Sequence, residues 1–163
     1  MINLFEIILM GTFATFFMDV TARLLIKSRI VKPTIKPQVV GRWALYMLKG
    51  KFVHKDIRLI PALKYEIPAA FLSHYLIGTV LAGIYFYLEL IVPAIRSQAW
   101  ASLIFGVTTS LFPWLWLYPA IGIGYLASKS KNQSDYIILS IINHLNFGIG
   151  LTIWIVISHR FFV

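Results

Sequence analysis

Four long apolar stretches restrict this chain to a membrane fold. They cover residues 4–26, 67–92, 99–126 and 136–158, and each reaches the roughly 20 residues that a helix needs to cross about 30 Å of hydrocarbon. The chain is 59% hydrophobic and only 13% charged, which is far from the composition of a soluble domain. The sequence therefore predicts an all-α polytopic membrane four-helix bundle, with residues 1–163 as a single domain.

The first apolar stretch is expected to stay in the protein as a helix. No Lys or Arg precedes it, and no cleavage pattern of small residues follows it, so it differs from a signal peptide. The chain has no cysteine, which excludes disulfides, thiolate metal sites and cysteine nucleophiles.

The basic residues predict the orientation. Eleven Lys and Arg residues lie in 23–64, and Lys129 and Lys131 follow the third stretch, whereas the opposite side has only Arg96 and Arg160. The positive-inside rule then predicts cytoplasmic basic loops, with both termini outside. The net charge of +9 lies beside membrane spans, so we expect membrane lipids and their anionic headgroups as partners, and no nucleic acid.

The basic loop, residues 27–66, is too patterned to be a simple connector. Within it, 39–48 carries apolar residues at helical spacing, which predicts a short interfacial helix with Trp43 as a membrane anchor. The segment 51–64 is expected to cap the cytoplasmic mouth of the bundle, with candidate mouth residues Arg42, Trp43 and His54. In the third stretch, Pro113 predicts a packing kink.

An internal duplication relates the second and fourth stretches. A shift of 70 residues places Ala70, His74, Gly78 and Ala82 over Ser140, His144, Gly148 and Thr152. Spacing by four keeps each set on one helix face, where small residues allow close helix packing. The first and third stretches match more weakly, through Gly11 over Gly106 and Thr15 over Ser110. The pattern predicts two tandem two-helix repeats around an axis along the membrane normal, with packing residues Ala70, Gly78, Ser140 and Gly148.

Three ionisable residues inside the predicted spans are candidates for chemistry. Counted along their helices, Asp19, His74 and His144 all lie roughly 9–12 Å below the cytoplasmic face. A buried Asp costs on the order of 2.5–3.5 kcal/mol in a membrane helix, so such residues usually turn inward and find partners. Thr15, Tyr75 and Asn143 are further candidates for binding a ligand or a proton.

Several functions are compatible with this cluster. One is binding, and translocation, of a small solute or cation at a cytoplasm-facing Asp/His site, by a protein expected to act as a homodimer. Asp19, His74 and His144 are then candidate ligands for a divalent cation. A second is a haem b held by His74 and His144 in an electron-transfer or haem-handling protein. A third is a purely structural polar cluster in a membrane scaffold or lipid-interacting protein. The sequence has no HExxH, GxSxG or phosphate-loop pattern, which disfavours an enzyme.

The chain also resembles a family of bacterial inner-membrane proteins known as domain of unknown function 2938. The resemblance rests on the order and spacing of "GTFATFFMDV", "VGRWALYMLKG", "FVHKDI", "SHYLIGTVLAG", "PAIGIGYLASKS" and "NHLNFGIGL". It implies a multi-pass protein of four helices in the bacterial inner membrane, and it implies no activity. Asp19, Gly41, Arg42, Trp43, His54, His74, Gly78, His144 and Gly148 fall in these motifs.

Overall fold

A computed structural model describes residues 4–95 and 98–161, with side chains up to residue 158. The described residues are helical or irregular and contain no strand. In chain order the elements are α1 (Leu4–Lys27), α2 (Pro37–Met47), η1 (Ile57–Leu59), α3 (Glu66–Ile91), η2 (Pro93–Ile95), α4 (Ala99–Thr108), η3 (Pro113–Leu117), α5 (Tyr118–Ala120), η4 (Tyr125–Ala127) and α6 (Gln133–Phe161).

Four helical segments are long and apolar enough to cross a membrane: Leu4–Lys27, Glu66–Ile91, Ala99–Ala120 and Gln133–Ser158. This confirms the prediction of an all-helical membrane protein with four such segments. Three of the predicted segments agree with the structure to within a few residues. The third was predicted to run to residue 126, and that boundary is wrong.

Glycines explain why the third segment ends early. The last helical residue of the segment is Ala120, and Gly122 and Gly124 follow with φ values of 91° and 85°. These left-handed conformations are readily adopted by glycine and end a helix. Hydropathy alone does not detect this stop, because Ile121, Ile123 and Leu126 keep the composition apolar.

The third segment is also interrupted at Pro113, as expected. Regular α-helix ends at Thr108, and residues Pro113–Leu117 form a π-helical turn before α5. Proline has no N–H for the helix ladder and its ring crowds the preceding turn, so a break at this point has a local cause. The break opens the helix beside Thr109, whose side chain forms a hydrogen bond with His144.

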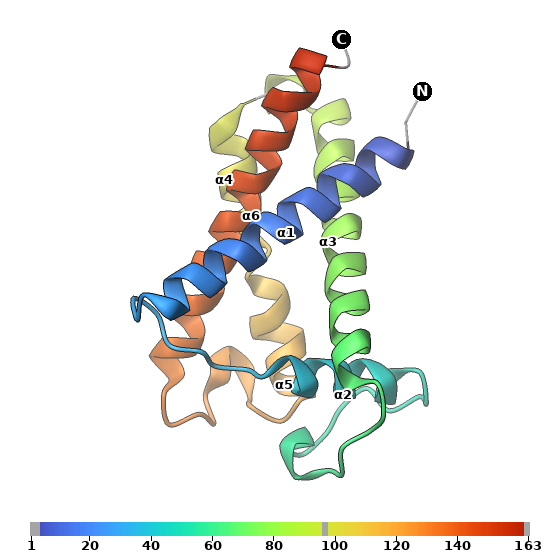
Figure 1. Cartoon of the computed structure of the whole chain (residues 1–163), viewed down its shortest axis with the longest axis vertical. Helices are drawn as coiled ribbons and strands as arrows, with labels where there is room; N and C mark the ends of the chain where they lie inside the picture. The colour runs from blue at the N-terminus through green and yellow to red at the C-terminus, as the bar shows by residue number, and fades with distance from the viewer. Residues whose placement is uncertain (1–3, 96–97, 162–163) are drawn as a thin grey trace.

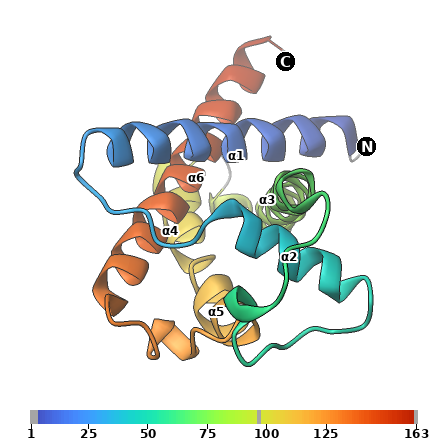
Figure 2. The same cartoon turned by 60° about the horizontal axis from the view of Figure 1, so that its bottom comes forward.

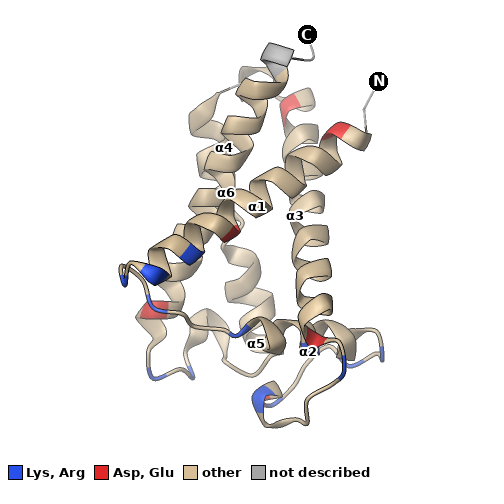
Figure 3. Ribbon diagram, in the orientation of Figure 1, with Lys and Arg blue, Asp and Glu red and all other residues tan. Residues whose placement is uncertain are grey.

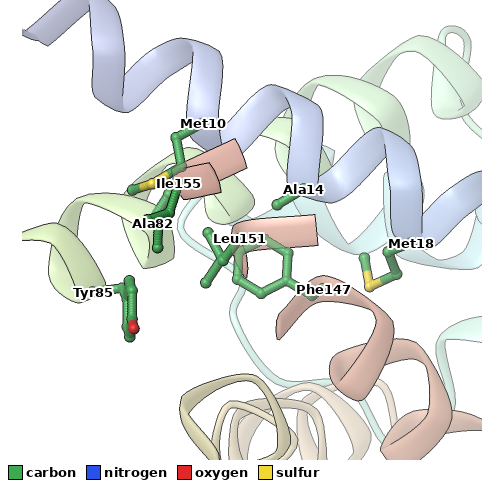
Figure 4. Packing of buried hydrophobic residues seen from close by; sticks show 8 residues of the cluster. All are labelled: Met10, Ala14, Met18, Ala82, Tyr85, Phe147, Leu151 and Ile155. Atoms are coloured by element: carbon green, nitrogen blue, oxygen red, sulfur yellow. The ribbon is translucent and has the colours of Figure 1, made fainter. Parts of the chain in front are cut away.

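The four long segments pack in the order α3, α1, α6 and α4. Helix α1 contacts both α3 and α6, while α6 also contacts α4, and α1 crosses the other helices at a tilt (Figure 1). Their shared core contains Met10, Ala14, Met18, Ala82, Tyr85, Phe147, Leu151 and Ile155. Figure 4 shows these side chains converging from α1, α3 and α6.

Glycines allow close approaches between the long helices. A Cβ on Gly11 of α1 would lie 2.9 Å from the Thr79 nitrogen of α3, and one on Gly106 of α4 would lie 2.8 Å from Gly148 Cα of α6. Both distances are too short for any side chain, so each helix pair is held at backbone contact.

The basic loop folds into a cap under one end of the bundle (Figure 2). The backbone N–H groups of His54 and Ile57 donate to the carbonyls of Ala120 and Ile121, at 2.7 and 3.1 Å. A second core lies at this junction and contains Trp43, Ile57, Tyr118, Ala120, Ile121, Ile123, Ala127 and Tyr136. The loop is therefore part of the folded protein, and it joins the end of the third segment to α2.

Helix α2 was predicted over 39–48 and is found at Pro37–Met47, with Pro37 in its first turn. The prediction that Trp43 anchors the helix in the membrane surface is wrong. Trp43 is only 2% exposed and its Nε1–H donates to the carbonyl of Phe52 at 2.9 Å. The apolar face of α2 packs on protein instead.

Charge is distributed very unevenly between the two ends of the bundle. Figure 3 shows Lys and Arg gathered at the end with α2 and the connecting loops, away from the start of α1 and the end of α6. The two basic segments counted in the sequence, 23–64 and 129–131, therefore lie at the same end. Arg96 and the Arg160 side chain lie outside the described residues.

Candidate functional site

A cavity of about 440 Å³ lies between α1, α3 and α6, above the cap. The kinked part of the third segment and the 33–37 segment complete its walls. Most of its lining is apolar, and its charged or polar lining residues are Thr15, Asp19, Arg23, Thr34, Ser73, His74, Ser140, Asn143 and His144, with Trp43 and Tyr118 adding polar aromatic groups. A mainly apolar cavity with a few convergent polar groups is the usual form of a small-molecule site.

Asp19 of α1 and His74 of α3 form an ion pair in this lining, which also includes the guanidinium of Arg23 one turn after Asp19. Their Oδ1 and Nε2 atoms are 3.1 Å apart, and the side chains are 20% and 39% exposed. The glycine contact between α1 and α3 one to two turns away brings the two helices close enough for this pair. Such a pair carries one negative charge with neutral His74 and none with protonated His74. It can therefore exchange a proton or hold a cation.

His144 of α6 has a neutral partner. Its Nδ1 is 2.7 Å from Thr109 Oγ1, and that hydroxyl also donates to the Gly106 carbonyl at 2.6 Å. Because the hydroxyl has a single proton, this network assigns the proton between Thr109 and His144 to Nδ1. The Nε2 atom of a neutral His144 is then a hydrogen-bond acceptor. His144 and His74 lie near enough for their charges to interact.

Asn143 supplies an unpaired acceptor in the same wall. Its Oδ1 is buried and has no hydrogen-bond partner in the described part of the protein. A buried polar atom without a partner is unfavourable by about 1–3 kcal/mol, so a ligand with an N–H or O–H group would relieve it.

Two other predicted ligand residues play different parts. The Thr15 hydroxyl donates to the Gly11 carbonyl of its own helix at 2.8 Å and is fully buried against Gly78. Tyr75 does not line the cavity, but its ring makes an edge contact with His74 at a centroid distance of 6.0 Å, and it interacts electrostatically with Asp19. Thr15 thus shapes the helix contact, and Tyr75 supports the Asp19–His74 pair from behind.

Arg42, predicted at the mouth, joins three parts of the chain. Its Nε donates to Glu66 Oε1 at 2.5 Å, and its Nη1 donates to the carbonyls of Ile57 and Ile60. The hydrogen bond with Glu66 raises the pKa of Arg42, against the opposing effect of burial. Arg42 therefore fastens α2 and the cap to the first turn of α3.

The other two mouth candidates are also buried. Trp43 lines the cavity floor, whereas His54 is 7% exposed and lies in the cap with its ring edge against Tyr46, at a centroid distance of 5.1 Å. Of the three mouth candidates, Trp43 is the one that borders the cavity.

The four predicted packing residues separate into two kinds. Gly78 lies against Thr15 of α1 and Gly148 against Ser102 and Leu103 of α4, both at helix contacts inside one chain. Ala70 and Ser140, one turn before the histidines, line the cavity, as Gly78 also does. Small side chains at these two positions leave the space that the cavity occupies.

The described residues do not contain a group of three or more His, Cys, Asp or Glu side chains placed to hold a metal ion. Asp19, His74 and His144 therefore share a cavity without forming such a group. A haem between the histidines has less support than a solute, because His74 Nε2 faces the Asp19 carboxylate at 3.1 Å and would have to leave it to bind iron.

Sequence reasoning missed two important partners, Thr109 and Glu66. A single Thr in an apolar span is common because its hydroxyl can bond its own helix, so nothing marks Thr109 as a partner of His144. Glu66 did carry a signal, since an acidic residue directly before an apolar stretch is unusual and needs a partner.

The fold and cavity define an all-helical protein with four segments long and apolar enough to cross a membrane, and with a mainly apolar internal cavity that holds a few polar groups. The chain belongs to the family described as protein of unknown function DUF2938, whose model matches residues 8–158. No curated protein and no solved structure matches the chain.

Proposed function

We propose that this protein binds a small organic cation in the cavity between α1, α3 and α6, and moves it across the membrane. The observation that carries the proposal is the Asp19 carboxylate in an otherwise mainly apolar cavity of about 440 Å³. Its apolar lining includes Phe71, Ile77, Leu81, Phe112, Leu139 and Phe147. Such walls suit a hydrocarbon or aromatic group, and a carboxylate suits the charged end of the same molecule.

The polar atoms favour an amine as the charged group. Asp19 offers a carboxylate, Asn143 Oδ1 is an acceptor without a partner, and His144 Nε2 is a further acceptor. An ammonium group has three donors and no acceptor, so it complements all of them. A bare divalent cation has less support, because no three His, Cys, Asp or Glu side chains converge in the described residues.

The Asp19–His74 pair also supports coupling to protons. A cation that binds Asp19 competes with a proton on His74, because both neutralise the same carboxylate. Bound solute and bound proton are therefore alternatives, which is the requirement for exchanging one for the other.

The helix pairs support a mechanism with two moving halves. In both pairs, α1 with α3 and α4 with α6, the first helix approaches the second through a glycine, and Gly78 and Gly148 lie in these contacts. We take the pairs as tandem repeats that rock about the cavity.

The proposed location is the bacterial inner membrane, with both termini outside and α2 at the cytoplasmic boundary. The gathering of Lys and Arg at one end supports this orientation (Figure 3). As expected from the small size of the bundle, the working unit in this proposal is a homodimer.

Binding of phenethylamine by the purified protein, measured by calorimetry, tests the proposal. We expect saturable binding that falls at least about tenfold in Asp19→Asn, because a hydrogen bond to a charged group is worth about 1.5–3 kcal/mol. Glu6→Gln removes the same charge from the other end of α1 and should leave the affinity unchanged. Phenylethanol, which has the same aromatic group without the positive charge, should bind more weakly than the amine. Equal affinity in the parent and Asp19→Asn would overturn the proposal.

A further inference from the structure

A second cavity, of about 430 Å³, lies between the basic loop and the start of α6. Four cationic side chains line it, Lys32, Arg58, Lys129 and Lys131, against the single carboxylate of Asp135. They come from segments far apart in the sequence, so the fold itself assembles this group. We infer that the cavity binds the phosphate of an anionic membrane lipid, as a site separate from the solute cavity.

The existing ion pairs leave about half of this positive charge available, because Asp56 and Asp135 pair with two of the four cations. Arg58 uses Nε and Nη2 on Asp56 and keeps Nη1. Lys32 lies 3.5 Å from Asp135, with its own side chain 77% exposed. Lys129 and Lys131 have no acidic partner in the described residues. An anion with several oxygens would contact three or four of these groups together.

The position of the cavity favours a lipid as the source of the phosphate. Its residues lie just beyond the end of α1 at Lys27 and around the start of α6 at Gln133, which is where membrane helices meet the headgroups. Tyr125 and Leu126, a few residues before Lys129, are 64% and 42% exposed. Such side chains suit contact with the upper parts of lipid chains.

The site also has a structural consequence. Pro33 and Thr34 line both cavities, so a bound headgroup would contact the segment that forms part of the solute cavity wall. The Tyr136 hydroxyl holds the same segment by donating to the Thr34 carbonyl at 3.3 Å. A lipid at this position would therefore join the end of α1 to the start of α6.

Native mass spectrometry and thermal unfolding in neutral detergent test the site, with dioctanoyl phosphatidylglycerol as the probe. We expect one saturable lipid per chain and a raised melting temperature. The affinity for the lipid should fall roughly 30-fold in the double variant Lys129→Gln, Lys131→Gln. Each lysine near an anionic headgroup contributes roughly a fivefold gain in affinity, so the loss of two multiplies.

The matched control is Lys51→Gln, Lys55→Gln, which removes the same charge from exposed parts of the basic loop outside the cavity. Its affinity should stay within about twofold of the parent, because distant surface charges are screened. Equal weakening in the two double variants would overturn the site in favour of diffuse attraction. The site would also be overturned if dioctanoyl phosphatidylcholine, or inorganic phosphate alone, raised the melting temperature as much as dioctanoyl phosphatidylglycerol does.

Discussion

His74 of α3 and His144 of α6 lie 70 residues apart in the chain, which is the offset of the predicted repeat, but their surroundings differ. His74 faces the Asp19 carboxylate at 3.1 Å, whereas His144 faces the Thr109 hydroxyl at 2.7 Å. The first half of the bundle therefore holds an ionisable pair, and the second half presents to the same cavity a histidine whose partner is a neutral hydroxyl. The comparison teaches that a repeated histidine need not have a repeated role.

The starts of α3 and α6 differ in the same way. Glu66 begins α3 and forms an ion pair with Arg42, while Tyr136, at the position 70 residues later, donates to the Thr34 carbonyl. Both contacts fasten the basic loop to the bundle. The ion pair at the start of α3 is buried, whereas the start of α6 has a neutral hydrogen bond and the more exposed Lys32–Asp135 ion pair.

The largest expected effect tests these two fastenings. Arg42→Ala should lower the free energy of unfolding by about 3–5 kcal/mol, because it leaves Glu66 buried without its partner. Tyr136→Phe removes one neutral hydrogen bond and should cost about 0.5–1.5 kcal/mol. Unfolding in detergent micelles measures both. Equal losses of unfolding free energy would mean that the Arg42–Glu66 ion pair stabilises the protein no more than the Tyr136–Thr34 hydrogen bond.

A double-mutant cycle sharpens the contrast between the histidines. Asp19→Asn combined with His74→Ala should show a coupling energy of about 1.5–3 kcal/mol, as expected for a hydrogen bond to a charged group. The cycle of Asp19→Asn with His144→Ala should show a clearly smaller coupling, since His144 bonds to Thr109. A coupling of similar size in both cycles would show that the three residues act as one cluster.

The glycine contacts should respond unequally to an added methyl group. A Cβ on Gly148 would lie 2.5 Å from the Ser102 carbonyl oxygen and 3.0 Å from Leu103 Cα, whereas one on Gly78 would meet mainly the Thr15 side chain. Side chains yield more easily than backbone, so Gly148→Ala should cost about 1–3 kcal/mol and Gly78→Ala less. Melting temperatures of the two variants give the comparison, and a larger loss in Gly78→Ala would contradict it.

The smallest effect is expected in the cap that joins the halves. Asp56 Oδ1 accepts from the Arg58 backbone N–H at 2.9 Å, and the Arg58 side chain lowers the Asp56 pKa below its usual value of 3.8. A lowered carboxyl pKa stabilises the folded protein at pH values above the usual pKa of the carboxyl group. This contribution disappears as the pH falls through the pKa of the folded state. Asp56→Ala should cost about 1 kcal/mol at pH 7. That loss should shrink below pH 4, and an unchanged loss across this range would contradict the assignment.

Much of the fold could be predicted because hydrocarbon imposes a length and a composition on each span. The early end of the third segment could not, since it depends on the backbone angles of Gly122 and Gly124. Trp43 was misjudged because an apolar helix face looks the same in sequence whether it meets lipid or protein. Asp19 and His74 were predicted at one depth from helix geometry, but the partner of His144 depends on the break at Pro113.

The most direct test of the central claim, a cytoplasm-facing cation site, uses the absence of native cysteine in the chain. Ser73→Cys and Ser140→Cys place single thiols in the cavity wall, and Ser102→Cys, at a fully buried position outside it, serves as the control. A membrane-impermeant thiol reagent should label the two cavity positions in inside-out vesicles, and phenethylamine should slow that labelling unless Asp19→Asn is also present. Labelling only in right-side-out vesicles, or labelling that phenethylamine leaves unchanged, would contradict the account.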